Sequence, residues 1–326
     1  MRMMMFSKVM PKSRRSAALR LLTLATAALL SLAVLPGLSA QQERLSVVAT
    51  TTDLAYIAAQ VGGDRVETSA LLSGREDPHF ARARPDYIVR LNRADLFIEV
   101  GMELEAAWSS IVRDSSRNKQ IIGGGRGYVD ASVGIRVLER PKTRVTRAMG
   151  DVHGAGNPHY WTDPLNAVII ARNIRDALIR INPASKPTYQ QNYLSFHERM
   201  KQLTIREARK FAPYKGLRVA VFHREFAYLA QRFGFEVVDS IEEIPGVPPS
   251  AARLREVSEL LKSEGVRIIL MAPYNDPGPS ESVAERIGAK LIRMPISVAS
   301  EPGMDTYEQT IEAMLERIRA AADATK

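Results

Sequence analysis

Histidine is the residue type of this chain with the clearest capacity for chemistry. The sequence has 326 residues and only five histidines. His79 and His159 each follow a proline and His223 follows an apolar run, so we expect all three in loops beside regular elements. Imidazole binds Zn²⁺ well near neutral pH, and three imidazoles are a common ligand set. We predict that these three histidines converge on one divalent metal ion. The alternative is three unrelated, hydrogen-bonded loop histidines.

The other two histidines have less specific surroundings. His153 lies six residues before His159 in a segment rich in Gly and Pro, which argues against a regular element between them. Pro164 suits the first turn of a helix, and the apolar residues after it follow helical spacing. We expect His153 to support this loop, with direct metal ligation as the alternative. His197 lies in a long helical pattern, where a packed or surface position is expected.

Regular elements must bring the histidines together, and the sequence predicts alternating strands and helices. Strands are predicted at residues 45–49, 66–72, 94–100, 217–222, 237–238, 266–271 and 290–294. Helices are predicted at residues 54–61, 85–93, 102–112, 163–181, 188–211, 226–233, 250–261, 280–287 and 307–320. This alternation is typical of an α/β protein with mainly parallel sheets flanked by helices. Ligands of such folds bind at the carboxyl ends of strands, where His79 and His223 are expected.

The helical pattern at residues 188–211 is long enough to join two domains, because it would span about 35 Å. We therefore predict an N-terminal lobe at residues 41–186, a linking helix at 187–212 and a C-terminal lobe at 213–326. Two of the three candidate ligands belong to the first lobe and one to the second. The ion would then bind in the cleft between the lobes, where pockets are expected.

Residues 1–40 have the features of a cleaved signal peptide. Six basic residues and no acid precede or flank an apolar run at 21–35, and small residues follow it. The run is short for a membrane span, although an uncleaved anchor is the alternative. A twin-arginine route is only weakly suggested by Arg14 and Arg15, beside the general secretory route. We expect export to the periplasm.

Composition narrows the function further. The full chain carries a formal charge of +9 from 45 basic and 36 acidic residues. Six of the basic residues lie in the leader, and the chain without it has a formal charge of +3. This balance does not indicate a nucleic-acid partner. The chain has no cysteine, so it has neither disulfides nor thiolate ligands, and no site for a lipid at the cleavage point. We expect a soluble monomer that is not a lipoprotein.

Three motifs carry a resemblance to a known family. They are Asp77-Pro78-His79-Phe80, then Asn157-Pro158-His159-Tyr160-Trp161-Thr162-Asp163-Pro164, then Val221-Phe222-His223-Arg224-Glu225-Phe226. In this order they resemble the solute-binding proteins of zinc and manganese ABC importers, the adhesin-like cluster. The resemblance covers nearly the whole mature chain. It implies two α/β lobes joined by one rigid helix, one metal ion per chain, and delivery to a membrane permease.

The resemblance leaves the fourth ligand open. Members of the family usually supply one, often Asp, just after the penultimate strand. Here that position falls in Met294-Pro295-Ile296-Ser297, which has no acid. Glu301, further along the same loop, is the predicted fourth ligand. Asp305, Asp276, His153 and water are the alternatives.

Other residues of the motifs are expected to support the site. Asp77, Asp163 and Glu225 are interpreted as helix caps or as hydrogen-bond acceptors for the ligands. Tyr160 and Trp161 are expected to form the wall of the pocket rather than to bind metal.

Three imidazoles favour Zn²⁺ over Mn²⁺, which prefers more oxygen ligands, and Fe²⁺ is a further alternative. We expect a transport protein rather than an enzyme. A periplasmic zinc hydrolase is the second hypothesis, because three histidines and an open position also describe a catalytic zinc. Glu225 is the only nearby candidate for its general base. A metallochaperone or adhesin that works without a permease is the third hypothesis.

Overall fold

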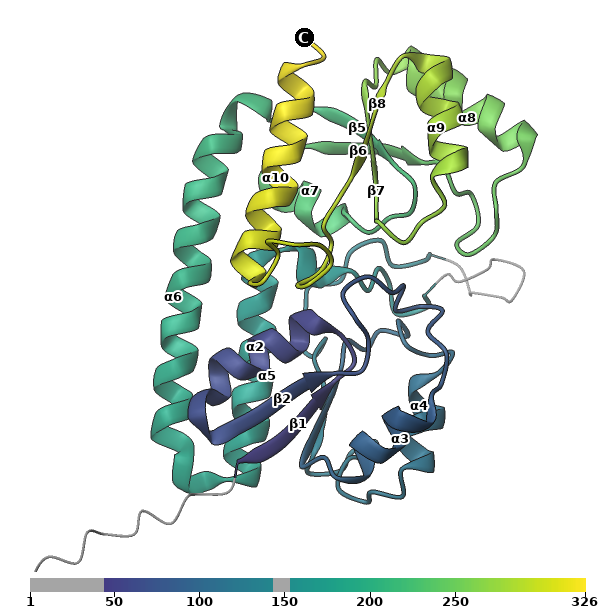
Figure 1. The fold of residues 1–326 in the computed structure, drawn as a ribbon. Coiled ribbons are helices and arrows are strands. Elements are labelled where there is room, and N and C mark those ends of the chain that lie inside the picture. The colour runs from purple at the N-terminus through teal and green to yellow at the C-terminus, as the bar shows by residue number, and fades with distance from the viewer. Residues whose placement is uncertain (1–43, 143–152) are drawn as a thin grey trace, which may run out of the picture. The chain divides into compact units, whose positions relative to one another are not determined.

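Two four-stranded parallel sheets organise the chain (Figure 1). The computed structural model describes residues 44–142 and 153–326, so the predicted leader lies outside the described residues. The first sheet has the order β2-β1-β3-β4 and the second the order β6-β5-β7-β8. The strands are β1 (Leu45–Ala49), β2 (Val66–Ala70), β3 (Leu96–Glu99), β4 (Tyr128–Asp130), β5 (Arg218–Val221), β6 (Glu236–Ser240), β7 (Ile268–Met271) and β8 (Lys290–Arg293). We call the two sheets with their helices the N-terminal and the C-terminal lobe.

Helices connect the strands, as the alternating pattern predicts. They are α2 (Thr52–Gly62), α3 (Pro85–Asn92), α4 (Ser109–Ser115), α5 (Pro164–Ile181), α6 (Lys186–Phe211), α7 (Ala227–Phe233), α8 (Ala251–Ser263), α9 (Pro277–Ile287) and α10 (Tyr307–Asp323). Side-chain caps fix several starts, because they satisfy backbone N–H groups that the first turn leaves free. Asp163 caps α5, Ser250 caps α8, and Thr306 with Gln309 forms a capping box on α10. The predicted α/β architecture is confirmed.

Both sheets are covered on both faces. In β3, Leu96 and Ile98 point to one core while Phe97 points to another. In β7, Ile268 and Leu270 share the core of Leu96, whereas the alternate residues face a third core under α8 and α9. This alternation follows from the two-residue period of a strand. One large hydrophobic core is thus shared by both lobes, and each lobe has a smaller core of its own.

The long helix α6 packs along both lobes (Figure 1). Its 26 residues contact α2 and α5 of the N-terminal lobe and α7 and α10 of the C-terminal lobe. Phe196, Met200 and Leu203 lie four and three residues apart, so they form one buried stripe on the helix. The predicted long helix is therefore present and connects the two lobes. The exact domain limits remain a prediction.

A second connection returns from the C-terminal lobe to the N-terminal lobe. After β8, the loop at residues 294–306 reaches the N-terminal lobe before α10 begins. The Thr52 hydroxyl donates to the carbonyl oxygen of Val298, whose own N–H donates to Asp53. Gly74 approaches the same loop so closely that a Cβ atom there would lie 2.1 Å from the Val298 oxygen. The loop that carries His79 is thereby packed against the returning chain.

Two local predictions differ from the structure. The predicted helix at residues 102–112 is shorter and later, because Met102 and Glu103 adopt positive φ angles of 53° and 67°. The carboxylate of Glu105 accepts hydrogen bonds from the N–H groups of Val100 and Gly101, which holds this turn at the end of β3. The short strand β4 was not predicted, since its three residues carry too little periodic signal. No helix among the described residues combines the length and apolar composition needed to span a membrane.

Candidate metal centre

His79 lies in the loop after β2, where Asp77 fixes both its backbone and its ring. One Asp77 carboxylate oxygen accepts from the His79 N–H at 2.9 Å and from ring atom Nδ1 at 2.7 Å. The imidazole is 5% exposed. Trp108 anchors the same loop by donating its indole N–H to the Pro78 carbonyl at 2.8 Å. Because Asp77 takes Nδ1, Nε2 is the ring atom that would serve as metal donor.

His159 repeats this arrangement directly before the short 3-10 helix Tyr160–Thr162. The Asn157 side-chain oxygen accepts from the His159 N–H at 2.9 Å and from its Nδ1 at 3.0 Å. The imidazole is 1% exposed, and its buried Nε2 has no hydrogen-bond partner among the described residues. A buried polar atom without a partner costs free energy, which a bound metal ion would recover.

His223 lies two residues after β5 and is held from a different part of the chain. Its Nδ1 donates to a carboxylate oxygen of Glu242 at 2.8 Å. Glu242 is itself positioned by its second oxygen, which accepts from the Gly246 N–H at 2.8 Å. The acceptor again takes Nδ1 and directs Nε2 away from it, as in metal sites whose ligands are oriented by a carboxylate.

The structure brings these three histidines together. Each offers one ring nitrogen such that the three nitrogens lie within 4.8 Å of one another. The ring centroids are 5.1 Å apart for His79 and His159, 5.3 Å for His79 and His223, and 5.2 Å for His159 and His223. With metal–nitrogen bonds of about 2.0–2.1 Å, tetrahedral coordination places ring centroids about 5 Å apart. The donor set therefore fits one divalent ion.

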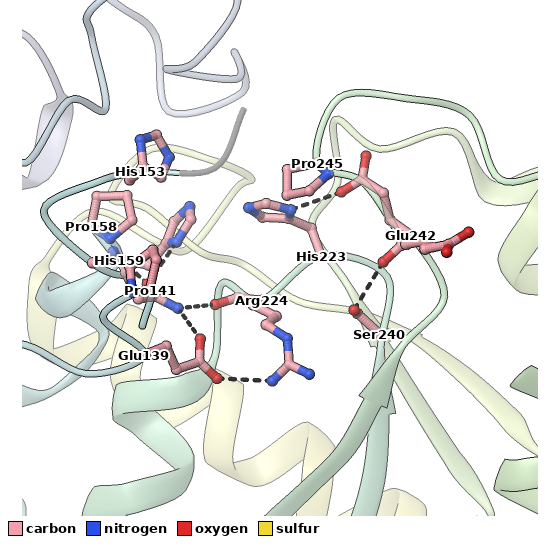
Figure 2. Close-up of a pocket in the computed structure, with 13 residues that line it drawn as sticks. Glu139, Pro141, His153, Pro158, His159, His223, Arg224, Ser240, Glu242 and Pro245 are labelled. Carbon is pink, nitrogen blue, oxygen red and sulfur yellow. Dashed lines mark hydrogen bonds and ion pairs between the residues drawn. The ribbon is translucent and has the colours of Figure 1, made fainter. Parts of the chain in front are cut away.

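A cavity of about 320 Å³ opens beside the cluster. Its lining includes His153, His159 and His223, together with Arg224 and Glu242 (Figure 2). A second cavity of about 20 Å³ is lined by His223, His79 and the buried Glu225. The candidate ligands thus line both cavities.

Burial and neighbouring acids set the protonation of the ring nitrogens. Burial lowers the pKa of His159 well below its usual value, and the nearby imidazoles lower it further. Burial would also lower the pKa of His223, but Glu242, Glu225 and Asp77 raise it to about 9. At neutral pH His159 is therefore in the ligand form, whereas His223 holds a proton that a metal ion must displace.

The acids considered for a fourth position lie in other interactions. Glu301 forms an ion pair with Arg317. Asp276 caps α9 by accepting from the Gly278 N–H. Within the part of the chain that the structure describes, no carboxylate joins the group of three histidine nitrogens. The structure therefore does not bring Glu301, Asp305 or Asp276 to the cluster.

The supporting residues take more specific roles than the sequence indicated. Asp163 caps α5 and forms a two-bond ion pair with Arg232, each bond 2.8 Å. Glu225 accepts from the Asn275 side chain at 2.9 Å, and burial raises its pKa. Tyr160 donates its hydroxyl to the Val100 carbonyl. The ring of Trp161 lies 5.3 Å from that of His159, so it packs behind this ligand.

Two supporting groups were not found from the sequence. Glu242 is 19 residues from His223, and no local pattern connects them. Hydrogen bonds of the Asn157 side chain join the His159 loop to the His223 loop. The Asn157 amide donates to Glu139 and to the Arg224 carbonyl, each at 2.8 Å. Arg224 also pairs with Glu139 at 2.8 Å (Figure 2). The repeated Asx-Pro-His pattern could have indicated the role of Asn157.

Comparison with known sequences identifies the family. The sequence profile of the periplasmic zinc-uptake complex component A (ZnuA) matches residues 47–321, most of the chain. The chain belongs to the ZnuA family. Membership confirms the predicted resemblance to the metal-binding components of ABC importers.

Individual ZnuA-family relatives are distant. The high-affinity zinc uptake protein ZnuA of Brucella abortus is 28% identical over 162 residues, 49% of this chain and 48% of that protein. The zinc-binding lipoprotein AdcA of Streptococcus pneumoniae is 22% identical over 303 residues, 86% of this chain and 56% of that protein. The chain thus spans about half the length of these two relatives. The manganese-transporter lipoprotein PsaA of Streptococcus pneumoniae is 24% identical, covering 85% and 88% of the two chains.

Solved structures share the fold. A crystal structure of ZnuA superposes with a TM-score of 0.72 at 22% identity, covering 86% of this chain and 99% of that one. The laminin-binding protein Lmb of Streptococcus agalactiae gives a TM-score of 0.69 at 25% identity, covering 86% and 99%. These similarities confirm the two-lobe α/β fold of the ZnuA family.

Proposed function

We propose that this protein binds one divalent metal ion through Nε2 of His79, His159 and His223 and delivers it to the permease of an ABC importer. The observation that carries the proposal is the approach of three ring nitrogens from three loops to within 4.8 Å of one another. Their Nδ1 atoms are already held by Asp77, Asn157 and Glu242. Ligands oriented in this way do not have to be ordered when the ion binds.

Zn²⁺ is the ion that the donor set favours. Imidazole nitrogens suit Zn²⁺, whereas Mn²⁺ prefers more oxygen ligands. Relatives are named for zinc, for manganese and, in the Yersinia pestis protein YfeA, for iron. Mn²⁺ and Fe²⁺ are therefore the competing ions for a direct comparison of affinities.

We infer binding rather than catalysis, because the candidate base Glu225 is poorly placed for proton transfer to solvent. Glu225 is fully buried and accepts a hydrogen bond from Asn275. A hydrolase would need this carboxylate at a metal-bound water. Hydrolase activity of the zinc-loaded protein that is lost in Glu225→Ala would contradict this inference.

The same proposal includes export. The basic and apolar pattern of residues 1–40 supports a cleaved signal peptide, and the family is described as periplasmic. We also propose a monomer without a nucleic-acid partner, a proposal supported by three candidate ligands that come from one chain. Adhesion is a second candidate, since the structural relative Lmb is described as both an adhesin and a metal transporter. Laminin binding by the purified protein would test it.

Zinc titration of the purified protein by calorimetry tests the proposed site. We expect one ion per chain, and we expect His159→Ala to weaken zinc binding by at least two orders of magnitude because it removes a fully buried ligand. Circular dichroism should show that the fold persists. His197→Ala is the matched control, since His197 lies on α6 beside Tyr193. Unchanged stoichiometry and affinity in His159→Ala would refute the ligand assignment.

A further inference from the structure

His153 is a fourth histidine beside the proposed metal site, and it is buried. It is 8% exposed, and its ring centroid lies 5.2 Å from that of His79 with the two planes 28° apart. It lines the larger cavity together with His159 and His223, and Figure 2 shows it on the same side of that cavity as His159. Among the described residues, the three-histidine group of nitrogens does not include it.

The Nε2 atom of His153 is prepared to bind a ligand. It is buried and has no hydrogen-bond partner in the described part of the chain. The Nε2 of His159 is buried without a partner in the same way.

Hydrogen bonds anchor the backbone directly after His153. Gly154 donates its N–H to the Glu103 carboxylate at 2.6 Å, and the Gly156 N–H donates to the His153 carbonyl at 3.1 Å. These bonds fix the backbone beside the ring. The ring of His153 lies 5.2 Å from that of His79, close to the centroid spacings among the three candidate ligands.

Glu301 and Asp276 do not compete for this position. Glu301 is paired with Arg317, and Asp276 is used as a helix cap. Four-coordinate Zn²⁺ needs a fourth donor, either a protein group or water. His153 is a buried, unpartnered nitrogen beside the cluster, and its loop continues directly into the segment that carries His159.

We propose that His153 is the fourth metal ligand, so that four imidazoles surround the ion. This inference rests on the proposed function and adds its coordination number and selectivity. A site of four nitrogens and no oxygen favours Zn²⁺ over Mn²⁺ more strongly than three histidines and a carboxylate would. The chain then selects its cargo through one loop residue that is absent from the three family motifs.

X-ray absorption at the zinc edge tests the proposal directly, because imidazole gives a characteristic scattering pattern that can be counted. We expect four imidazoles per zinc in the unmodified protein and three in His153→Ala. In competition titrations, His153→Ala should weaken zinc binding about 10- to 100-fold and Mn²⁺ binding much less. His197→Ala should change neither the count nor the affinities.

The outcomes separate this inference from the proposed function. If the unmodified protein binds zinc with three imidazoles and His153→Ala leaves count and affinity unchanged, the fourth-ligand proposal is wrong and the transport proposal stands. A weaker affinity with an unchanged count of three would assign His153 to loop support and also overturn the proposal. His153→Gln, which keeps a polar side chain of similar reach, separates loss of ligation from loss of folding. Failure of the unmodified protein to bind zinc would refute the proposed function itself.

Discussion

At the scale of single residues, two of the candidate ligands are held by the same local device. An Asx residue two positions earlier accepts from both the backbone N–H and the Nδ1 of the histidine, in Asp77-Pro78-His79 and in Asn157-Pro158-His159. The proline between them restricts the backbone on both sides. Such a device depends only on residues two positions apart and needs no tertiary contact. His223 lacks it and depends on Glu242.

The protonation of His223 predicts how zinc affinity changes with pH. Its pKa is about 9, so below that value each zinc ion must displace a proton from this ring. We expect affinity to rise with pH by up to about tenfold per unit and to level off above pH 9. Competition with a chromophoric chelator from pH 6 to 9.5 measures this slope. Affinity that is flat over this range would contradict the assignment.

Glu242→Gln provides the matched variant for this titration. It keeps an acceptor for Nδ1 but removes the charge that raises the pKa of His223. The plateau of affinity should therefore begin at a lower pH than in the unmodified protein. A plateau at the same pH would show that Glu242 does not set this pKa.

At the scale of elements, loops at the carboxyl ends of strands carry the site, and other loops hold them in place. The segment after β6 supplies Glu242 and turns at Gly246, whose φ is +79°. Gly246 also faces the opposite lobe, because a Cβ atom there would lie 2.7 Å from the Phe80 ring. This glycine therefore links the acceptor of His223 to the residue that follows His79.

Gly246→Ala should weaken both the fold and the site. The positive φ is unfavourable for alanine and the added carbon displaces Phe80, so we expect a loss of stability of about 1–2 kcal/mol. Zinc affinity should fall by less than in His159→Ala, because the ligands themselves remain. Denaturant unfolding and calorimetry measure the two effects.

Gly265→Ala is the control for this prediction. Gly265 has a φ of +68°, and a Cβ atom there would meet nothing within 4 Å. It should reproduce the backbone strain without any change in zinc affinity. Equal zinc affinities in both variants would show that the Phe80 contact does not influence the site.

At the scale of the whole molecule, the lobes are joined by more than the long helix. Besides α6, the loop at 294–306 crosses back and binds the start of α2 through Asp53 and the His159 motif through Trp161. Burial raises the pKa of Asp53 to about 7, although the Val298 N–H lowers it in part. A buried carboxylate at the junction of the two lobes makes the stability of the whole fold depend on pH.

Asp53→Asn should remove this dependence. The folded pKa lies above the unfolded value, so the unfolded state gives up its proton first and stability falls as pH rises from about 4 to 7. The variant is neutral throughout. We expect it to match the unmodified protein near pH 4 and to be more stable at pH 8 by about 1–4 kcal/mol. Urea unfolding at both pH values measures the difference.

The exposed carboxylate of Asp64 provides the control. Its side chain is 74% exposed, so Asp64→Asn should change stability little at either pH. A stability difference for Asp53→Asn that is the same at pH 4 and pH 8 would show that ionisation of this residue is not its cause.

The sequence alone determined the local features of this protein. Helix starts at Asp163 and Ser250, the strand–helix alternation and the three histidine motifs all depend on residues near each other in the chain, where propensity and periodicity are informative. The three candidate ligands could be chosen because Gly, Pro and the ends of apolar runs mark loops. The short strand β4 and the turn at Met102 could not, because their conformations depend on contacts with β3 and Glu105.

Only the tertiary structure decided which side chains surround the site. It places Glu242 on His223, joins Asn157 to Arg224 across the lobes, pairs Glu301 with Arg317, and brings His153 against His79. These partners are separated by 16 to 74 residues along the chain, and no sequence period connects such positions. Packing of the two sheets around their shared core brings them together, which is why the surroundings of the metal site follow from the fold and not from the motifs.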